Sequence, residues 1–160
     1  MYCLKCKRLV LDADECCGQP LAGTQLPPRV EGNAERLKIK FLEYRTGDIN
    51  REQLTAYLDR EEQRAEQILA HVPGTEEYDE DTLAIMAEEL EAGTRGILAY
   101  LQALSMAREW ILQPSSELLQ SALAMAAQGD ALVNDAVEMN WRTHRTFLDS
   151  AREFLKQMGF

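Results

Sequence analysis

Apolar residues recur at the spacing of an α-helix from about residue 31 to the end of the chain. Gly47 can end the first helix in the left-handed conformation. Asn50 and Gln53 have the spacing of a capping box at the start of the second helix. The whole pattern predicts four helices, over about 31–46, 51–72, 80–112 and 115–157.

The third predicted helix has the strongest pattern, because leucine or isoleucine recurs every seven residues along it. A second series, three residues later, contains the small residues Gly93 and Ala107, at which we expect a neighbouring helix to approach closely. Together the two series form the a/d seam of a heptad repeat. The first series comprises Leu83, Leu90, Ile97, Leu104 and Ile111.

The fourth predicted helix would be about 64 Å long if continuous. Gln128-Gly129-Asp130 is the one place at which the pattern allows a kink or a break. Asn140 and His144 lie four residues apart on its otherwise apolar seam. We interpret them as a polar layer that fixes register, with an exposed surface or a functional site as alternatives. Apolar residues also lie off this seam, so we expect a homodimer in which a second copy buries part of the long helices.

All four cysteines lie in the first 17 residues, in the pattern C-x2-C-x9-C-C. Four thiolates around one tetrahedral ion are the ligand set of structural zinc and of mononuclear iron. The nine intervening residues, 7–15, fit a short β-hairpin, which metal binding would fold. The predicted metal ligands are Cys3, Cys6, Cys16 and Cys17.

The CxxC…CCGQPL arrangement of residues 1–21 resembles the desulforedoxin-type module that also heads desulfoferrodoxins. The resemblance implies that the four cysteines hold a single ion. Zinc is the ion that we favour, because most short cysteine knuckles in cytoplasmic proteins are structural. The alternative is a mononuclear iron that transfers electrons to a partner.

These patterns divide the 160-residue chain into a metal knuckle over 1–22, a linker rich in proline and glycine over 23–33, and a helical bundle over 34–160. The expected fold class is therefore mainly α: a small N-terminal metal-binding β-hairpin followed by an elongated antiparallel bundle with two long helices.

The formal net charge is −10, and it is unevenly distributed. Residues 1–30 carry four basic and three acidic side chains, whereas the remaining 130 residues carry 13 basic and 24 acidic ones. Such an acidic body repels phosphate backbones, so nucleic acid is not an expected partner.

The sequence contains no glycine-rich phosphate loop, nucleophile elbow or dinucleotide-binding fingerprint. Neither His71 nor His144 has the glutamate three residues earlier that a ferritin-like di-metal site requires. No apolar run is long enough to span a membrane, and no secretory signal is visible, so we expect a cytoplasmic protein. The expected function is non-enzymatic: a protein–protein interaction, scaffold or regulatory protein with a structural zinc knuckle. The alternative is an iron electron-transfer module fused to a helical bundle.

Overall fold

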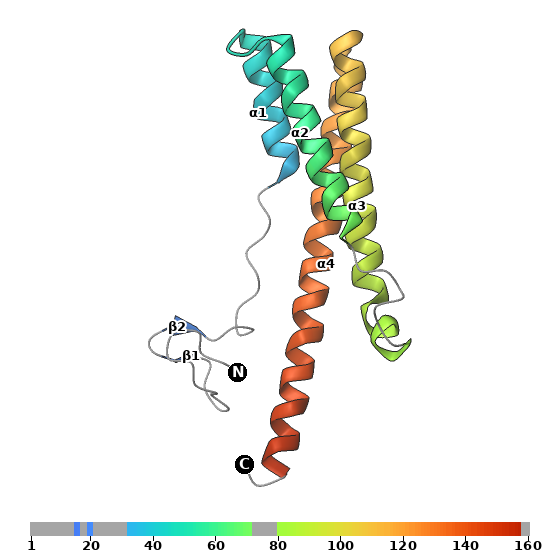
Figure 1. The fold of residues 1–160 in the computed structure, drawn as a ribbon. Coiled ribbons are helices and arrows are strands. Elements are labelled where there is room, and N and C mark those ends of the chain that lie inside the picture. Colours follow the sequence, from blue (N-terminus) through green and yellow to red (C-terminus); the bar gives the residue numbers. More distant parts are fainter. Residues whose placement is uncertain (1–14, 17–18, 21–31, 72–79, 158–160) are drawn as a thin grey trace. The chain divides into compact units, whose positions relative to one another are not determined.

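The computed structural model describes residues 15–16, 19–20, 32–71 and 80–157, which form two short strands and four helices (Figure 1). The mainly α fold is confirmed, and each helix begins and ends within two residues of its predicted position. Most of the predicted knuckle and linker lies outside the described residues. The elements are β1 (Glu15–Cys16), β2 (Gln19–Pro20), α1 (Asn33–Thr46), α2 (Arg51–Ala70), α3 (Glu80–Leu112) and α4 (Ser116–Gln157).

The helix ends are set by local signals in the sequence. The predicted capping box of α2 is present: the Gln53 amide donates to Asn50 Oδ1, and the Asn50 amide donates to Gln53 Oε1, both at 2.9 Å. Gly47 ends α1 with φ of 84°, in the left-handed region predicted for it. Ser115 caps α4 by accepting from the Leu118 amide at 3.3 Å. The helix is not broken at Gly129, because α4 is a single continuous helix.

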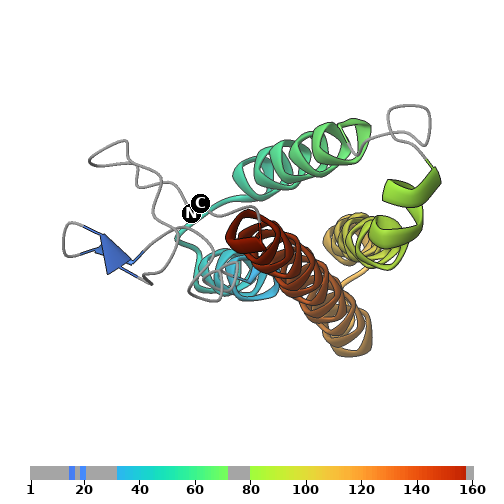
Figure 2. The ribbon, with the colours of Figure 1, turned by 90° about the horizontal axis from the view of Figure 1, so that it is seen from below.

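The chain divides into two compact units, one of residues 29–136 and one of residues 1–28 with 137–160. Within residues 29–136, α1 lies beside α4, and α2 lies beside α3, which runs antiparallel to α4 (Figures 1 and 2). Their core buries Leu37, Leu54, Leu58 and Leu104 completely. Trp110 closes one end of this core, with the ring of Phe41 packed edge-on at 5.0 Å between centroids.

The side of α3 that is buried is wider than its predicted seam. The later a and d positions are buried as expected, from Tyr100 to Ile111. In addition, the residue directly before each of the last four a positions is buried. In this third series Gly96 meets α4, whereas Trp110 packs against Phe41 and Tyr44 of α1, so α3 contacts more than one neighbour. The members of this series are Glu89, Gly96, Ala103 and Trp110.

The closest approach of α3 and α4 occurs where two glycines meet. A Cβ atom at Gly129 would lie 2.7 Å from the carbonyl oxygen of Gly96, and one at Gly96 would lie 2.8 Å from the carbonyl oxygen of Gly129. The approach expected at Gly93 was therefore placed three residues too early, since a Cβ there would meet only the Ala136 methyl at 3.6 Å, an ordinary contact.

Asp130, the next residue on α4, caps the start of α1. Gly32 occupies the N-cap position of α1 and has no side chain to satisfy the first amides. Asp130 Oδ1 accepts from both the backbone amide and the side-chain amide of Asn33 at 2.9 Å, and Oδ2 accepts from the Ala34 amide at 2.9 Å. Its negative charge also suits the positive end of the helix dipole. Asp130 thus fixes the start of α1 to α4.

The two glycines provide a test of the packing between α3 and α4. We expect Gly129→Ala to lower the free energy of unfolding by about 1–3 kcal/mol, because the new methyl group meets rigid backbone. Gly93→Ala is the matched control: its methyl group has room, and alanine favours a helix over glycine by about 1 kcal/mol. Urea unfolding followed by circular dichroism measures both changes. Equal effects of the two substitutions would contradict the close crossing.

Candidate functional site

The predicted metal site lies almost entirely outside the described residues. Cys3, Cys6 and Cys17 are not described, and Cys16 is described only as part of strand β1. This strand pairs antiparallel with β2, with Cys16 opposite Gln19. The four-cysteine site and the identity of its ion therefore stay predictions.

The two histidines do not gather other metal ligands around them. Among the residues that the structure describes, no group of three or more His, Cys, Asp or Glu side chains could hold a metal ion. His71 is exposed, and its Nδ1 atom lies 2.6 Å from the carbonyl oxygen of Gln67, one turn earlier on α2. Asn140 and His144 are both exposed in the single chain, which agrees with the surface alternative rather than with a buried polar layer.

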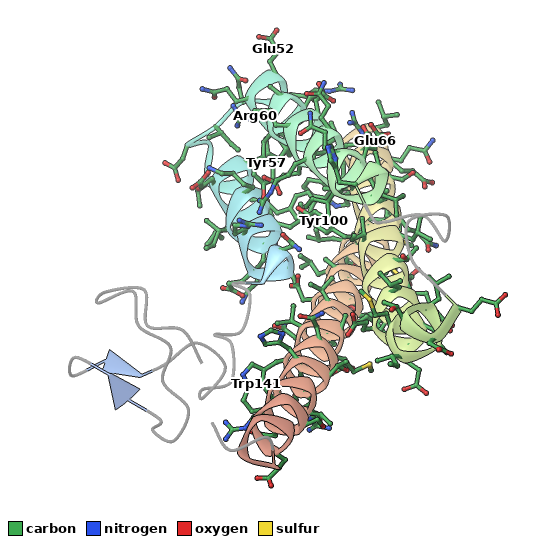
Figure 3. All side chains as sticks on the ribbon, turned by 60° about the horizontal axis from the view of Figure 1, so that its bottom comes forward. Glu52, Tyr57, Arg60, Glu66, Tyr100 and Trp141 are labelled. Carbon is green, nitrogen blue, oxygen red and sulfur yellow. The ribbon has the colours of Figure 1, made fainter. Side chains whose placement is uncertain are left out.

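Two tyrosines, labelled in Figure 3, and a glutamate form a polar network among α1, α2 and α3. The Tyr100 hydroxyl donates to Glu61 Oε2 at 3.0 Å. The same carboxylate oxygen lies 3.9 Å from Arg36 Nη2 and 3.7 Å from Arg64 Nη1. Tyr57 is only 7% exposed, and its buried hydroxyl makes no hydrogen bond with the described residues.

Burial decides the protonation of both phenols in this network. Loss of solvent raises the pKa of Tyr57, and the negative charge of Glu61 raises it further. Loss of solvent likewise raises the pKa of Tyr100 far above its ordinary value, with additional contributions from Tyr57 and Glu61. Two neutral phenols beside an ion-paired carboxylate contain neither an activated nucleophile nor an unengaged base. The network therefore ties helices together and does not resemble a catalytic centre.

A second polar connection joins α3 to α2 at the surface. Arg108 donates through Nη1 to Asp59 Oδ1 at 2.6 Å and through Nη2 to Glu62. Partial burial acts to lower the pKa of Arg108, but the hydrogen bonds and charges of the two carboxylates raise it overall. One guanidinium engaged with two carboxylates holds the α2–α3 pair in a single register.

The clearest candidate for a binding surface is a groove between the end of α2 and the first half of α3. The open groove has a volume of about 560 Å³. Its apolar surface comes from Ile68 on α2 and from Leu90, Gly93 and Ile97 on α3. Arg64, Gln67, His71, Glu89 and Thr94 add polar groups around these residues.

The described residues on either side of this groove, 64–71 and 80–95, carry six acidic side chains and two arginines, Arg64 and Arg95. They belong to the part of the sequence that accounts for most of the net negative charge. Between Arg64 and Arg95, residues 65–94 contain nine acidic side chains and no lysine or arginine. The rest of the chain is nearly balanced, with 18 acidic and 17 basic side chains. The excess of acidic residues can be read from the sequence. The groove cannot, because it depends on which part of α3 packs beside the last turn of α2.

Comparison with protein-family models, curated proteins and solved structures gives no match to this chain. Among the helices that the structure describes, none is long and apolar enough to cross a membrane. The residues and their geometry are thus the basis for assigning a function.

The raised tyrosine pKa values predict how stability depends on pH. An unfolded tyrosine ionises near pH 10, whereas Tyr57 and Tyr100 resist ionisation in the fold. Above about pH 10 the unfolded chain therefore binds fewer protons, and each such tyrosine lowers the free energy of unfolding by up to about 1.4 kcal/mol per pH unit.

Tyr100→Phe should weaken this alkaline loss and cost about 1 kcal/mol at neutral pH, where the hydrogen bond to Glu61 is removed. Urea unfolding at pH 8 and pH 11 measures both effects. Tyr44→Phe is the control, since Tyr44 packs against Trp110 outside the network. An alkaline slope unchanged by Tyr100→Phe would contradict the interpretation.

Proposed function

We propose that this chain is a non-enzymatic, cytoplasmic protein–protein interaction or scaffold protein, with a structural zinc ion bound by its N-terminal cysteines. The observation that carries the proposal is the groove between α2 and α3, an apolar surface left uncovered in the most acidic part of the chain. The polar networks of the described residues support the same view, because they join helices and offer no reactive group.

Zinc at the N-terminus is supported by the chemistry of its donors. Four cysteines within 17 residues suit a tetrahedral tetrathiolate site, and reduced thiols of the cytoplasm bind metal more readily than they form disulfides. Cys3, Cys6, Cys16 and Cys17 would hold the ion. A zinc ion there would supply folding free energy to a segment too short to bury a core of its own.

A homodimer formed through the long helices is part of the proposal. The start of the α3 seam is only half-buried at Leu83, and Ile85 beside it is 62% exposed. On α4, Leu132 and Met139 are also half-buried. Apolar residues left in this state along two long helices favour contact with a second copy.

Metal analysis of the purified chain tests the zinc site. We expect one zinc per chain, a colourless protein, and loss of the metal in Cys16→Ser/Cys17→Ser. The helical circular dichroism signal should persist, because the core of residues 29–136 contains no cysteine. His71→Ala/His144→Ala is the control and should retain the zinc. One iron per chain with reversible reduction would favour the electron-transfer alternative instead.

Light scattering at two protein concentrations tests the dimer. We expect twice the mass of the chain, 18.1 kDa, at the higher concentration. Ile85→Ser should shift the equilibrium toward monomer, because it removes exposed apolar surface from α3. Ile39→Ser, at a 46% exposed position on α1, is the control. A monomer at both concentrations would refute the dimer.

A further inference from the structure

We infer that the groove between α2 and α3 binds a basic amphipathic helix of a partner protein. This inference rests on the proposed interaction function and names the chemistry of its partner. The groove contributes an apolar surface between two helices, and the surrounding segment contributes the charge that selects a cationic ligand.

The apolar part of the groove suits a helix of about two turns. Its α3 residues run from Glu89 to Ile97, which corresponds to about 12 Å of helix axis. The sides of the groove are helices, so a helical ligand can place its side chains between theirs. Gly93 contributes to the groove between Leu90 and Ile97, although a Cβ atom at this position would face Ala136 of α4.

Among the described residues, the groove is open where the last turn of α2 lies against the first half of α3. Ile68 lies in the last turn of α2 and is 48% exposed, although it is a large apolar residue. Leu90 and Ile97 are half-buried, while later seam residues such as Leu104 are fully buried beneath α1 and α2. The apolar line continues one turn earlier to Met86, also half-buried. A ligand with apolar anchors at i, i+3 or i+4, and i+7 would match this line.

Charge identifies which amphipathic helix fits. Of the nine acidic side chains in residues 65–94, five lie exposed on α2 and α3, and Glu66 is labelled in Figure 3. They outnumber the two arginines of the region, Arg64, which lines the groove, and Arg95, which lies 3.6 Å from Glu91. The excess of negative charge attracts a cationic ligand and repels an acidic one. This charge acts over about 10 Å at moderate salt, roughly the diameter of a helix. The five are Glu66, Glu80, Asp81, Glu88 and Glu91.

The test uses the full-length chain and fluorescent peptides of defined chemistry. The probe is an 18-residue Leu/Lys peptide with leucine at i, i+3, i+4 and i+7. A Leu/Glu peptide of the same pattern tests charge, and a Leu/Lys peptide of the same composition without helical periodicity tests shape. Fluorescence anisotropy should show binding of the amphipathic Leu/Lys peptide at least tenfold tighter than that of either comparison peptide.

Matched variants locate the binding on the chain. Ile68→Ser should weaken binding tenfold or more, whereas Leu112→Ser, at a 68% exposed position at the end of α3, should not change it. Glu88→Gln/Glu91→Gln should weaken binding several-fold at low salt and little at high salt, because the removed charges act through solvent. Glu109→Gln/Glu117→Gln is the charge-matched control, with both residues exposed outside the acidic segment.

Three results would overturn the inference: equal binding by Ile68→Ser and Leu112→Ser, equal binding of the three peptides, or conversion of a dimer into a monomer by Ile68→Ser. The last result would identify a second copy of this chain as the occupant. The metal measurement is independent of the groove. Reversible iron redox would therefore contradict the proposed function without affecting the groove, and failure of the peptide test would contradict the groove without affecting the zinc site.

Discussion

The backbone contact between Gly96 and Gly129 is the constraint on which the arrangement of residues 29–136 depends. It holds α3 and α4 closer than any side chain would permit, and so fixes their register. Two hydrogen-bonded contacts with the shorter helices lie next to it. Tyr100, one turn after Gly96, reaches Glu61 on α2, and Asp130, the residue after Gly129, reaches the first amides of α1. One crossing between the long helices thus positions both shorter helices.

The sequence was sufficient for features that depend on neighbours along the chain. Helix limits, the Asn50 capping box and the Gly47 terminus all follow from residues a few positions apart. The heptad pattern identified the seam of α3 that is buried from Tyr100 to Ile111, but not the buried positions Glu89 and Gly96, because glutamate and glycine do not register as apolar residues. Likewise, a helix N-cap supplied by Asp130, 97 residues away, has no local signature. Of the candidate sites, the cysteine ligands could be named from spacing, whereas the groove required knowing where α2 ends against α3.

Negative charge and polar contacts have separate roles in this molecule. The carboxylates that join helices are matched: Glu61 lies near two arginines and accepts from the Tyr100 hydroxyl, while Asp59 and Glu62 share Arg108 at the surface. In the described residues beside the groove, 64–71 and 80–95, six carboxylates outnumber Arg64 and Arg95. This excess repels like charge, and the proposed recognition of an oppositely charged partner would give it a use.

The contact between Asp130 and α1 also bears on the order in which the chain can fold during synthesis. Translation produces α1 first, yet the carboxylate that satisfies its opening amides is added 97 residues later. The first turn of α1 therefore lacks its cap until the start of α4, Ser116 to Asp130, has been synthesised. The arrival of Asp130, rather than the formation of α1, sets the earliest moment at which the opening amides of α1 can make their final hydrogen bonds.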